Sequence, residues 1–189
     1  MSIDPSAPVS TPKLAQKPAT AADLFAFLDG LGIAHPTVEH QALFTVAESR
    51  SHRDRSPGAH TKNLFLKDKK TRFFLIVALA DAQIALNALH RQLGASGRFS
   101  FGSAEQMLEM LGVTPGSVTP FSAINDTDGR VTVILDREMM QHDVLNYHPL
   151  TNTMTTTIAR DDLLKFLRAT GHEPQIAQVS EGISAPPGL

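Results

Sequence analysis

The chain has 189 residues, of which 42% are hydrophobic and 19% are charged, and its formal net charge is −2 at pH 7. This length and composition suit one compact domain with a hydrophobic core. Because the chain has no cysteine, disulfides, cysteine-ligated zinc and a thiol nucleophile are excluded. The absence of cysteine also fits a reducing cytoplasm, where we expect the protein. No membrane partner is expected, since the longest apolar run, Phe73 to Ala80, is far too short for a membrane span.

Both ends of the chain have the composition of flexible tails. Residues 1–19 are rich in Ser, Pro, Ala and Thr without apolar periodicity, and residues 173–189 end in Ala-Pro-Pro-Gly-Leu. One domain, covering residues 20–172, is expected between them.

Helix signals recur along this domain. Thr20 with Asp23, and Ser103 with Gln106, have the spacing of a capping box, and a glycine follows most of the apolar stretches. The patterns predict helices over residues 20–30, 45–52, 81–93, 103–112 and 161–169.

Strand signals lie between the helices. Residues 61–67 alternate in polarity, whereas residues 72–79 are almost continuously apolar, as in a central strand that is covered on both faces. Residues 68–70 are expected to form the hairpin loop between them, and further strands are expected over 131–135, 144–147 and 154–159. The irregular order predicts an α/β fold of the α+β type, with a mixed, curled sheet flanked by helices.

The near-neutral net charge conceals a basic zone. Residues 50–72 contain eight Lys or Arg and two Asp, for a net charge of +6, while the rest of the chain contains nine bases and seventeen acids, for −8. Such a zone is what contact with phosphates requires. The alternative is a solvated hairpin tip, and for Lys67, Lys69 and Lys70 by themselves that alternative is favoured.

Standard catalytic motifs are absent from the sequence. There is no H-E-x-x-H, Walker, G-x-S-x-G or G-x-G-x-x-G pattern, and the eight histidines are scattered. We therefore expect neither a metal nor a cofactor.

Three segments stand out, although each has an ordinary structural explanation. Lys62 and Asn63 begin an apolar strand, where Lys62 either points to solvent or lines a site. The stretch 112–121 contains two glycines and two prolines, which suits either a plain turn or a loop whose backbone N–H groups polarise a carbonyl. His148 precedes a proline at a strand end and is either structural or directed at a pocket.

Taken together, these segments resemble the YbaK/ProX family of aminoacyl-tRNA editing domains. The resemblance rests on Thr61-Lys62-Asn63-Leu64-Phe65-Leu66, on Gly116-Ser117-Val118-Thr119-Pro120-Phe121 and on His148-Pro149-Leu150-Thr151-Asn152. It extends over residues 20–171, and the free-standing alanyl-tRNA(Pro) deacylases look most similar. The family is also similar to the editing insertion of bacterial prolyl-tRNA synthetases.

The resemblance implies hydrolysis of the ester of mischarged Ala-tRNA(Pro) in trans, because a synthetase site sized for proline cannot strongly exclude alanine. It implies that Lys62 meets a phosphate near the terminal adenosine, that Asn63 holds the substrate or ribose, and that His148 positions groups at the pocket. The acyl group would be bound by the loop of Gly116, Ser117, Val118, Thr119, Pro120 and Phe121. The family is thought to use water, helped by the 2′-hydroxyl of the tRNA.

Several alternatives remain open at this stage. The same fold could hydrolyse Cys-tRNA(Pro), or serve as a non-catalytic module that binds tRNA or associates with a synthetase, or bind a small molecule. For the enzyme, the expected partners are alanylated tRNA(Pro) and prolyl-tRNA synthetase. We also expect Arg50, Arg53 and Arg55 to contact the acceptor stem.

Overall fold

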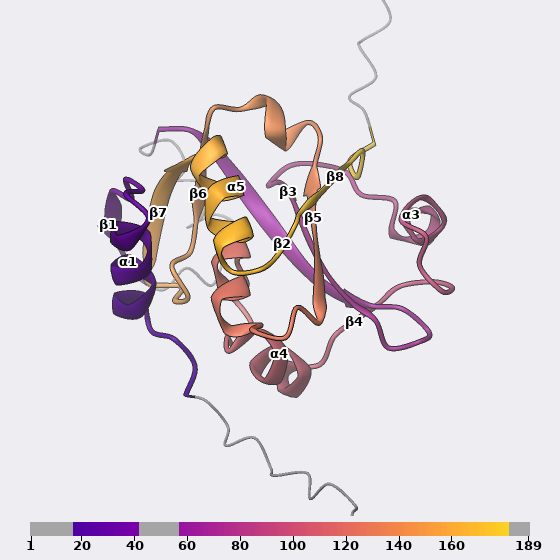
Figure 1. The fold of residues 1–189 in the computed structure, drawn as a ribbon. Coiled ribbons are helices and arrows are strands. Elements are labelled where there is room, and N and C mark those ends of the chain that lie inside the picture. The colour runs from indigo at the N-terminus through magenta and orange to yellow at the C-terminus, as the bar shows by residue number, and fades with distance from the viewer. Residues whose placement is uncertain (1–16, 42–56, 182–189) are drawn as a thin grey trace, which may run out of the picture.

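The structure is a computed structural model that describes residues 17–41 and 57–181 (Figure 1). Within these residues the chain forms one mixed sheet in the order β1-β7-β6-β2-β3-β5-β8, with β4 paired to β2. Its strands are β1 Thr37–Glu39, β2 Ala59–Lys67, β3 Phe73–Leu79, β4 Ser100–Phe101, β5 Val131–Asp136, β6 Val144–Tyr147, β7 Met154–Ala159 and β8 Gln175–Ala177. Because β2 runs antiparallel to β3 but parallel to β6, the expectation of a mixed sheet is confirmed.

The helices of the described residues are α1 Ala21–Gly30, α3 Leu86–Gln92, α4 Ala104–Leu111 and α5 Arg160–Ala169, with 3₁₀ turns η1 Pro120–Asn125 and η2 Met139–Gln141. Thr20 and Ser103 form the capping boxes that their spacing predicted. Helix α3 starts at Leu86 instead of residue 81, without a side-chain cap, so its predicted start was wrong. The helix predicted over 45–52 lies outside the described residues. None of the described helices is long and apolar enough to cross a membrane.

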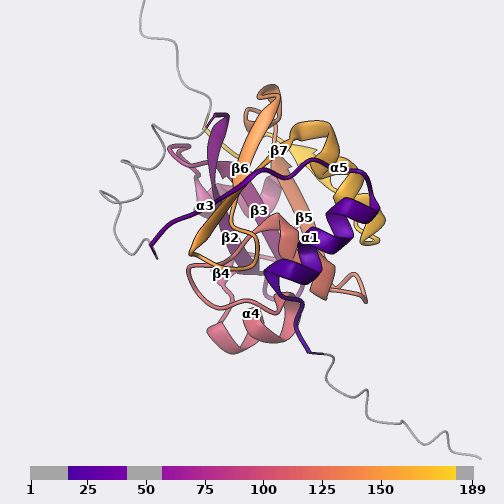
Figure 2. The ribbon, with the colours of Figure 1, turned by 90° about the vertical axis from the view of Figure 1, so that its left-hand side faces the viewer.

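The two faces of the sheet carry separate cores. The larger core includes Phe65, Leu75 and Val133 and packs against α1, α4, α5 and η1. The smaller core includes Leu66, Ile76 and Ile134 from the alternate strand positions and packs against α3. Figures 1 and 2 show this division, with α3 on one side of the central strands and α1 and α5 on the other.

The C-terminal boundary differs from the prediction. Strand β8 pairs in parallel with β5, and the N–H groups of Val179 and Ser180 donate to Oδ1 of the fully buried Asp136 at 2.9 and 3.1 Å. The fold therefore continues through residues 173–181, and the predicted start of a flexible tail at residue 173 was wrong. Composition did not indicate β8 because it is short and is held mainly by backbone bonds to β5.

A buried carboxylate fixes the turn between β2 and β3. Asp68 Oδ1 accepts from the N–H groups of Lys70 and Arg72 at 2.9 and 3.0 Å, and Oδ2 accepts from Arg72 Nε and Ser96 N–H at 2.8 and 2.9 Å. Burial alone would raise the pKa of Asp68, but the backbone N–H groups of Ser96, Arg72 and Lys70 and the Arg72 side chain outweigh it. Together they lower the pKa to about 2.

We predict that Asp68→Asn lowers the free energy of unfolding at pH 7 by roughly 1–3 kcal/mol, because an amide nitrogen would face the Arg72 and Ser96 donors. The folded pKa of about 2 lies below the ordinary value of 3.8, so the carboxylate stabilises the fold above pH 4 and loses this effect as the pH falls toward 2. Urea unfolding at pH 7, 4 and 2.5 should show the gap to wild type closing. A gap that is constant with pH would contradict this account, and Lys70→Gln serves as the control.

Candidate functional site

Lys62 and Asn63 are neighbours in β2 but face opposite sides of the sheet. Lys62 pairs with Ala78 and lies on the face of Leu66 and the smaller core, whereas Asn63 lies on the face of Phe65 and the larger core. The Lys62 side chain is half-buried and its ammonium donates to the backbone carbonyl of Ala82, in the turn after β3. An ammonium has three N–H donors, so two remain for a ligand.

Asn63 supplies an unpaired acceptor. Its Oδ1 atom is buried and has no hydrogen-bond partner within the described residues. A buried polar atom without a partner costs folding free energy, so such atoms in native proteins call for an explanation. A ligand hydroxyl or N–H group would satisfy this oxygen.

The glycine-proline loop between α4 and η1 forms a tight turn. The N–H of Ser117 donates to the carbonyl of Thr114 at 3.0 Å, which places Pro115 and Gly116 at the centre of the turn. Gly116 has φ +90°, a conformation that L side chains rarely adopt, and is exposed. The sequence therefore needs glycine at this position.

Most other residues of this loop are buried and hold it in place. Ser117, Thr119, Pro120 and Phe121 are all buried, and the Phe121 ring packs against Tyr147 and Phe166 with centroid distances of 5.8 and 5.3 Å. Thr119 Oγ1 accepts from the N–H of Phe121 at 3.3 Å. These buried residues therefore hold the loop against the larger core.

The same bonds decide which backbone donors remain available. The N–H groups of Ser117 and Phe121 are taken up within the loop. Those of Gly116 and Val118 have no acceptor among the described residues. Any polarisation of a carbonyl by this loop would thus come from Gly116 and Val118, and not from Ser117.

His148 follows β6 and carries its proton on a defined nitrogen. Nδ1 lies 2.8 Å from the backbone carbonyl of Met154, which can only accept, so Nδ1 donates. Burial lowers the pKa of His148, the Met154 bond opposes this shift, and the nearby His40 lowers it further. The neutral ring then presents Nε2 as an acceptor.

His40 is a neighbour that the sequence pattern did not indicate. Its ring centroid lies 6.1 Å from that of His148, and its backbone N–H donates to the carbonyl of Thr153 at 2.9 Å. This contact joins the end of β1 to the turn between β6 and β7. Only the sheet topology brings the two histidines together.

The structure brings two of the three predicted segments into contact. A Cβ atom placed on Gly116 would lie 3.7 Å from Asn152 Nδ2, so the glycine loop and the turn that follows His148 are adjacent. Asn63 shares the sheet face of this loop, whereas Lys62 lies on the opposite face. Arg50, Arg53 and Arg55 lie outside the described residues. The described residues contain no cluster of three or more His, Asp or Glu that could hold a metal ion.

Asn146 secures the start of β2 and was not predicted as a site residue. It is 3% exposed, its Nδ2 donates to the carbonyl of Pro57 at 2.7 Å, and its Oδ1 accepts from Thr157 Oγ1 at 2.7 Å. At Gly58, with φ +86°, an added Cβ would lie 2.7 Å from the carbonyl oxygen of Val144, so only glycine fits. The one available signal was a polar residue inside an apolar strand.

Fold and site together define a mixed α/β domain in which the backbone N–H groups of Gly116 and Val118, a histidine and a lysine are candidate ligand-binding groups. A family model for the aminoacyl-tRNA editing domain matches residues 40–166, and the chain belongs to this family.

Relatives agree with this assignment. The chain is 43% identical over 159 residues to the mouse prolyl-tRNA synthetase associated domain-containing protein 1, covering 82% of this chain and 94% of that protein. It is 32% identical over 150 residues to the prolyl-tRNA editing protein ProX of Acetoanaerobium sticklandii, covering 79% and 91%. A solved structure of a candidate trans-editing enzyme for prolyl tRNA synthetase matches with a TM-score of 0.66 over 87% of this chain and 99% of that one. At 20% identity, that last match shows the fold alone.

We predict that Asn146→Asp destabilises the fold by roughly 1–3 kcal/mol, because the carboxylate cannot donate to the Pro57 carbonyl. Thr157→Val removes only the donor to Oδ1 and should have a smaller effect. Chemical denaturation of both variants, with hydrogen exchange of the backbone amides of residues 58–61, measures these effects. Unchanged exchange in Asn146→Asp would show that Asn146 does not hold the start of β2.

Proposed function

We propose that this chain is a free-standing editing deacylase that hydrolyses the ester of alanine mischarged onto tRNA(Pro). The observation that carries the proposal is the Gly116 turn, where the N–H groups of Gly116 and Val118 have no acceptor among the described residues. This turn is adjacent to Asn152 in the segment that follows His148, in a chain of the editing-domain family. The name of the ProX relative supports prolyl-tRNA as the substrate class. We further propose a cytoplasmic location and prolyl-tRNA synthetase as a partner.

The site offers electrostatic and positioning groups to the ester. The N–H groups of Gly116 and Val118 point to stabilisation of negative charge on the carbonyl oxygen as water attacks, a contribution of about 3 kcal/mol per well-placed donor. The ammonium of Lys62 suits a phosphate near the terminal adenosine. The Oδ1 of Asn63, which has no partner among the described residues, suits a ribose hydroxyl. The Nε2 of His148 is placed to accept a hydrogen bond from a hydroxyl of the substrate or from water.

Substrate choice would follow from size. In this proposal the acyl group lies beside Gly116 and Asn152, which are adjacent, and a methyl side chain needs less room there than a pyrrolidine ring. Cysteine differs from alanine by one sulfur atom, so Cys-tRNA(Pro) is the second candidate substrate. A non-catalytic module remains the second candidate function, since the mouse relative is named only for association with the synthetase.

A panel of tRNA(Pro) charged with Ala, Cys, Ser or Pro tests the proposal. We predict that wild type removes alanine fastest and leaves proline in place. Lys62→Ala should lower kcat/KM for Ala-tRNA(Pro) by about 10- to 100-fold, because it removes a charged contact worth roughly 1.5–3 kcal/mol. Lys165→Ala, an exposed lysine on α5, is the control. If Cys-tRNA(Pro) is hydrolysed fastest, cysteine replaces alanine as the assigned substrate. If the protein binds tRNA but hydrolyses none of the esters, it is a binding module.

The depressed pKa of His148 predicts a pH dependence. Since this pKa lies below the ordinary value of 6.5, the ring is neutral at pH 7, and kcat/KM should fall only at lower pH, as Nε2 gains a proton. His148→Asn should abolish this acid limb. His40→Asn should move it to higher pH, because His40 lowers the pKa of His148. The test measures kcat/KM at pH 5–8 for each variant, corrected for spontaneous hydrolysis of the ester. An acid limb that persists in His148→Asn would exclude His148 as its source.

A further inference from the structure

Basic residues gather at the end of the β2–β3 hairpin that lies away from Lys62. We call them the hairpin patch; they come from the hairpin and from the loop before β4, and they are Lys67, Lys69, Lys70, Arg72 and Arg98. Lys69, Lys70 and Arg98 are exposed, and none of these three has a carboxylate partner among the described residues. They are therefore free to meet an external anion.

The hairpin patch is built on a rigid support. The carboxylate of Asp68 accepts hydrogen bonds from the N–H of Lys70 in the hairpin turn and from the N–H of Ser96, and so joins the two segments. The N–H of Lys69 donates to the carbonyl of Ser96 at 3.0 Å, and the Lys69 side chain runs so close to Gly97 that a Cβ there would lie 2.7 Å from Lys69 Cδ. Lys69 and Arg98 are thus held on adjoining segments.

Few acidic residues lie close to these charges in the sequence. Asp81 is the one acidic residue in the sequence between Lys69 and Ala104, and Asp68 is buried and already bonded to Arg72 and backbone donors. The chain as a whole has a net charge of −2. A cation-rich area on an otherwise acidic surface attracts a polyanion by its local field, not by its total charge.

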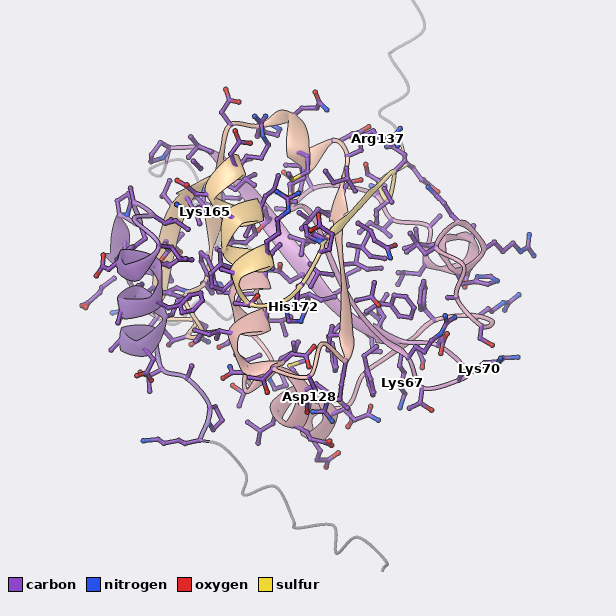
Figure 3. The ribbon with its side chains drawn as sticks, in the orientation of Figure 1. Lys67, Lys70, Asp128, Arg137, Lys165 and His172 are labelled. Carbon is purple, nitrogen blue, oxygen red and sulfur yellow. The ribbon has the colours of Figure 1, made fainter. Side chains whose placement is uncertain are left out.

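The position of the hairpin patch relative to the candidate site fits a long substrate. Lys62 and Lys67 are five residues apart in the same extended strand, which corresponds to about 17 Å. Figure 3 shows Lys67 and Lys70 together at the hairpin end, well separated from Arg137 and Lys165. An RNA whose 3′ end lies at Lys62 would reach the hairpin patch with its stem.

From these observations we propose that the hairpin patch binds phosphates of the stem of the tRNA substrate, as a surface additional to the predicted arginines at positions 50, 53 and 55. The choice of tRNA rests on the proposed function. Phosphate contacts of this kind orient a nucleic acid without reading its sequence. The patch would then strengthen binding of the whole tRNA and leave the chemistry at the ester unchanged.

The test compares two double variants that remove the same charge. Lys69→Gln with Lys70→Gln changes the hairpin patch, whereas Arg137→Gln with Lys165→Gln removes two exposed cations elsewhere. Uncharged tRNA(Pro) is titrated against each at 50–200 mM salt. We expect the slope of log Kd against log salt to fall by about 1–2 in the hairpin variant only. Equal slopes in the two variants would overturn the proposal.

A second measurement separates this proposal from the proposed function. In the hairpin variant, KM for Ala-tRNA(Pro) should rise at unchanged kcat, while kcat/KM for an alanylated 3′-terminal trinucleotide stays within about twofold of wild type. Equal losses on both substrates would overturn the proposal. If wild type binds tRNA through the patch but hydrolyses no ester, the hairpin surface stands and the deacylase assignment fails.

Binding to anionic lipid vesicles is the third measurement, and it tests a membrane surface as the alternative partner of the hairpin patch. Phe101, the register partner of Leu66 in β4, is 62% exposed near the patch, and an exposed ring beside cations also suits a membrane surface. Vesicle binding that is lost in the hairpin variant, with tRNA binding unaffected, would overturn the RNA proposal.

Discussion

The arrangement of the site depends on the pairing of β2, which lies between β6 and β3 in the sheet. Its first two residues pair in parallel with β6, and residues 61–67 pair antiparallel with β3. The parallel pairing with β6 lies next to Lys62 and Asn63. Asn146 and Gly58 make it possible, the first by bonding the Pro57 carbonyl and the second by admitting the close approach of Val144. The strand that joins the two parts of the sheet is therefore also the strand that presents the candidate lysine.

This arrangement explains how a site without a built-in nucleophile could promote ester hydrolysis. In the proposed reaction each protein group would supply an electrostatic field or a fixed position: N–H dipoles at Gly116 and Val118, a charge at Lys62, and a hydrogen-bond acceptor at His148. None of these groups needs to form a bond to the substrate. The attacking water and the neighbouring ribose hydroxyl would then provide the reacting atoms, and the protein would lower the barrier through preorganised electrostatics.

The sequence predicted local features well, because they depend on residues close together in the chain. Capping boxes at Thr20 and Ser103 and the glycine at 112 set the ends of α1 and α4 as expected. The start of α3 was wrong because no capping residue marks it, and β8 was missed because its stability comes from β5 and Asp136, distant in sequence.

The same limit applies to the candidate site. The motifs identified Lys62, Asn63, Gly116 and His148, but not that the first two face opposite sides of the sheet. His40 and Asn146 act through contacts with distant segments, which no local pattern records. Likewise, the use of the Ser117 N–H within its own turn follows only from the conformation of that turn.

The account is tested most directly by the structure of this protein bound to a non-hydrolysable analogue, in which alanine is joined to the 3′ end of a short RNA by an amide. We predict that the alanyl carbonyl oxygen accepts from the N–H groups of Gly116 and Val118, with a phosphate at Lys62 and a ribose hydroxyl at Asn63. The account would be contradicted if the alanyl group lay elsewhere, for example in the cavity of about 230 Å³ lined by Lys17, Leu108 and Asn125.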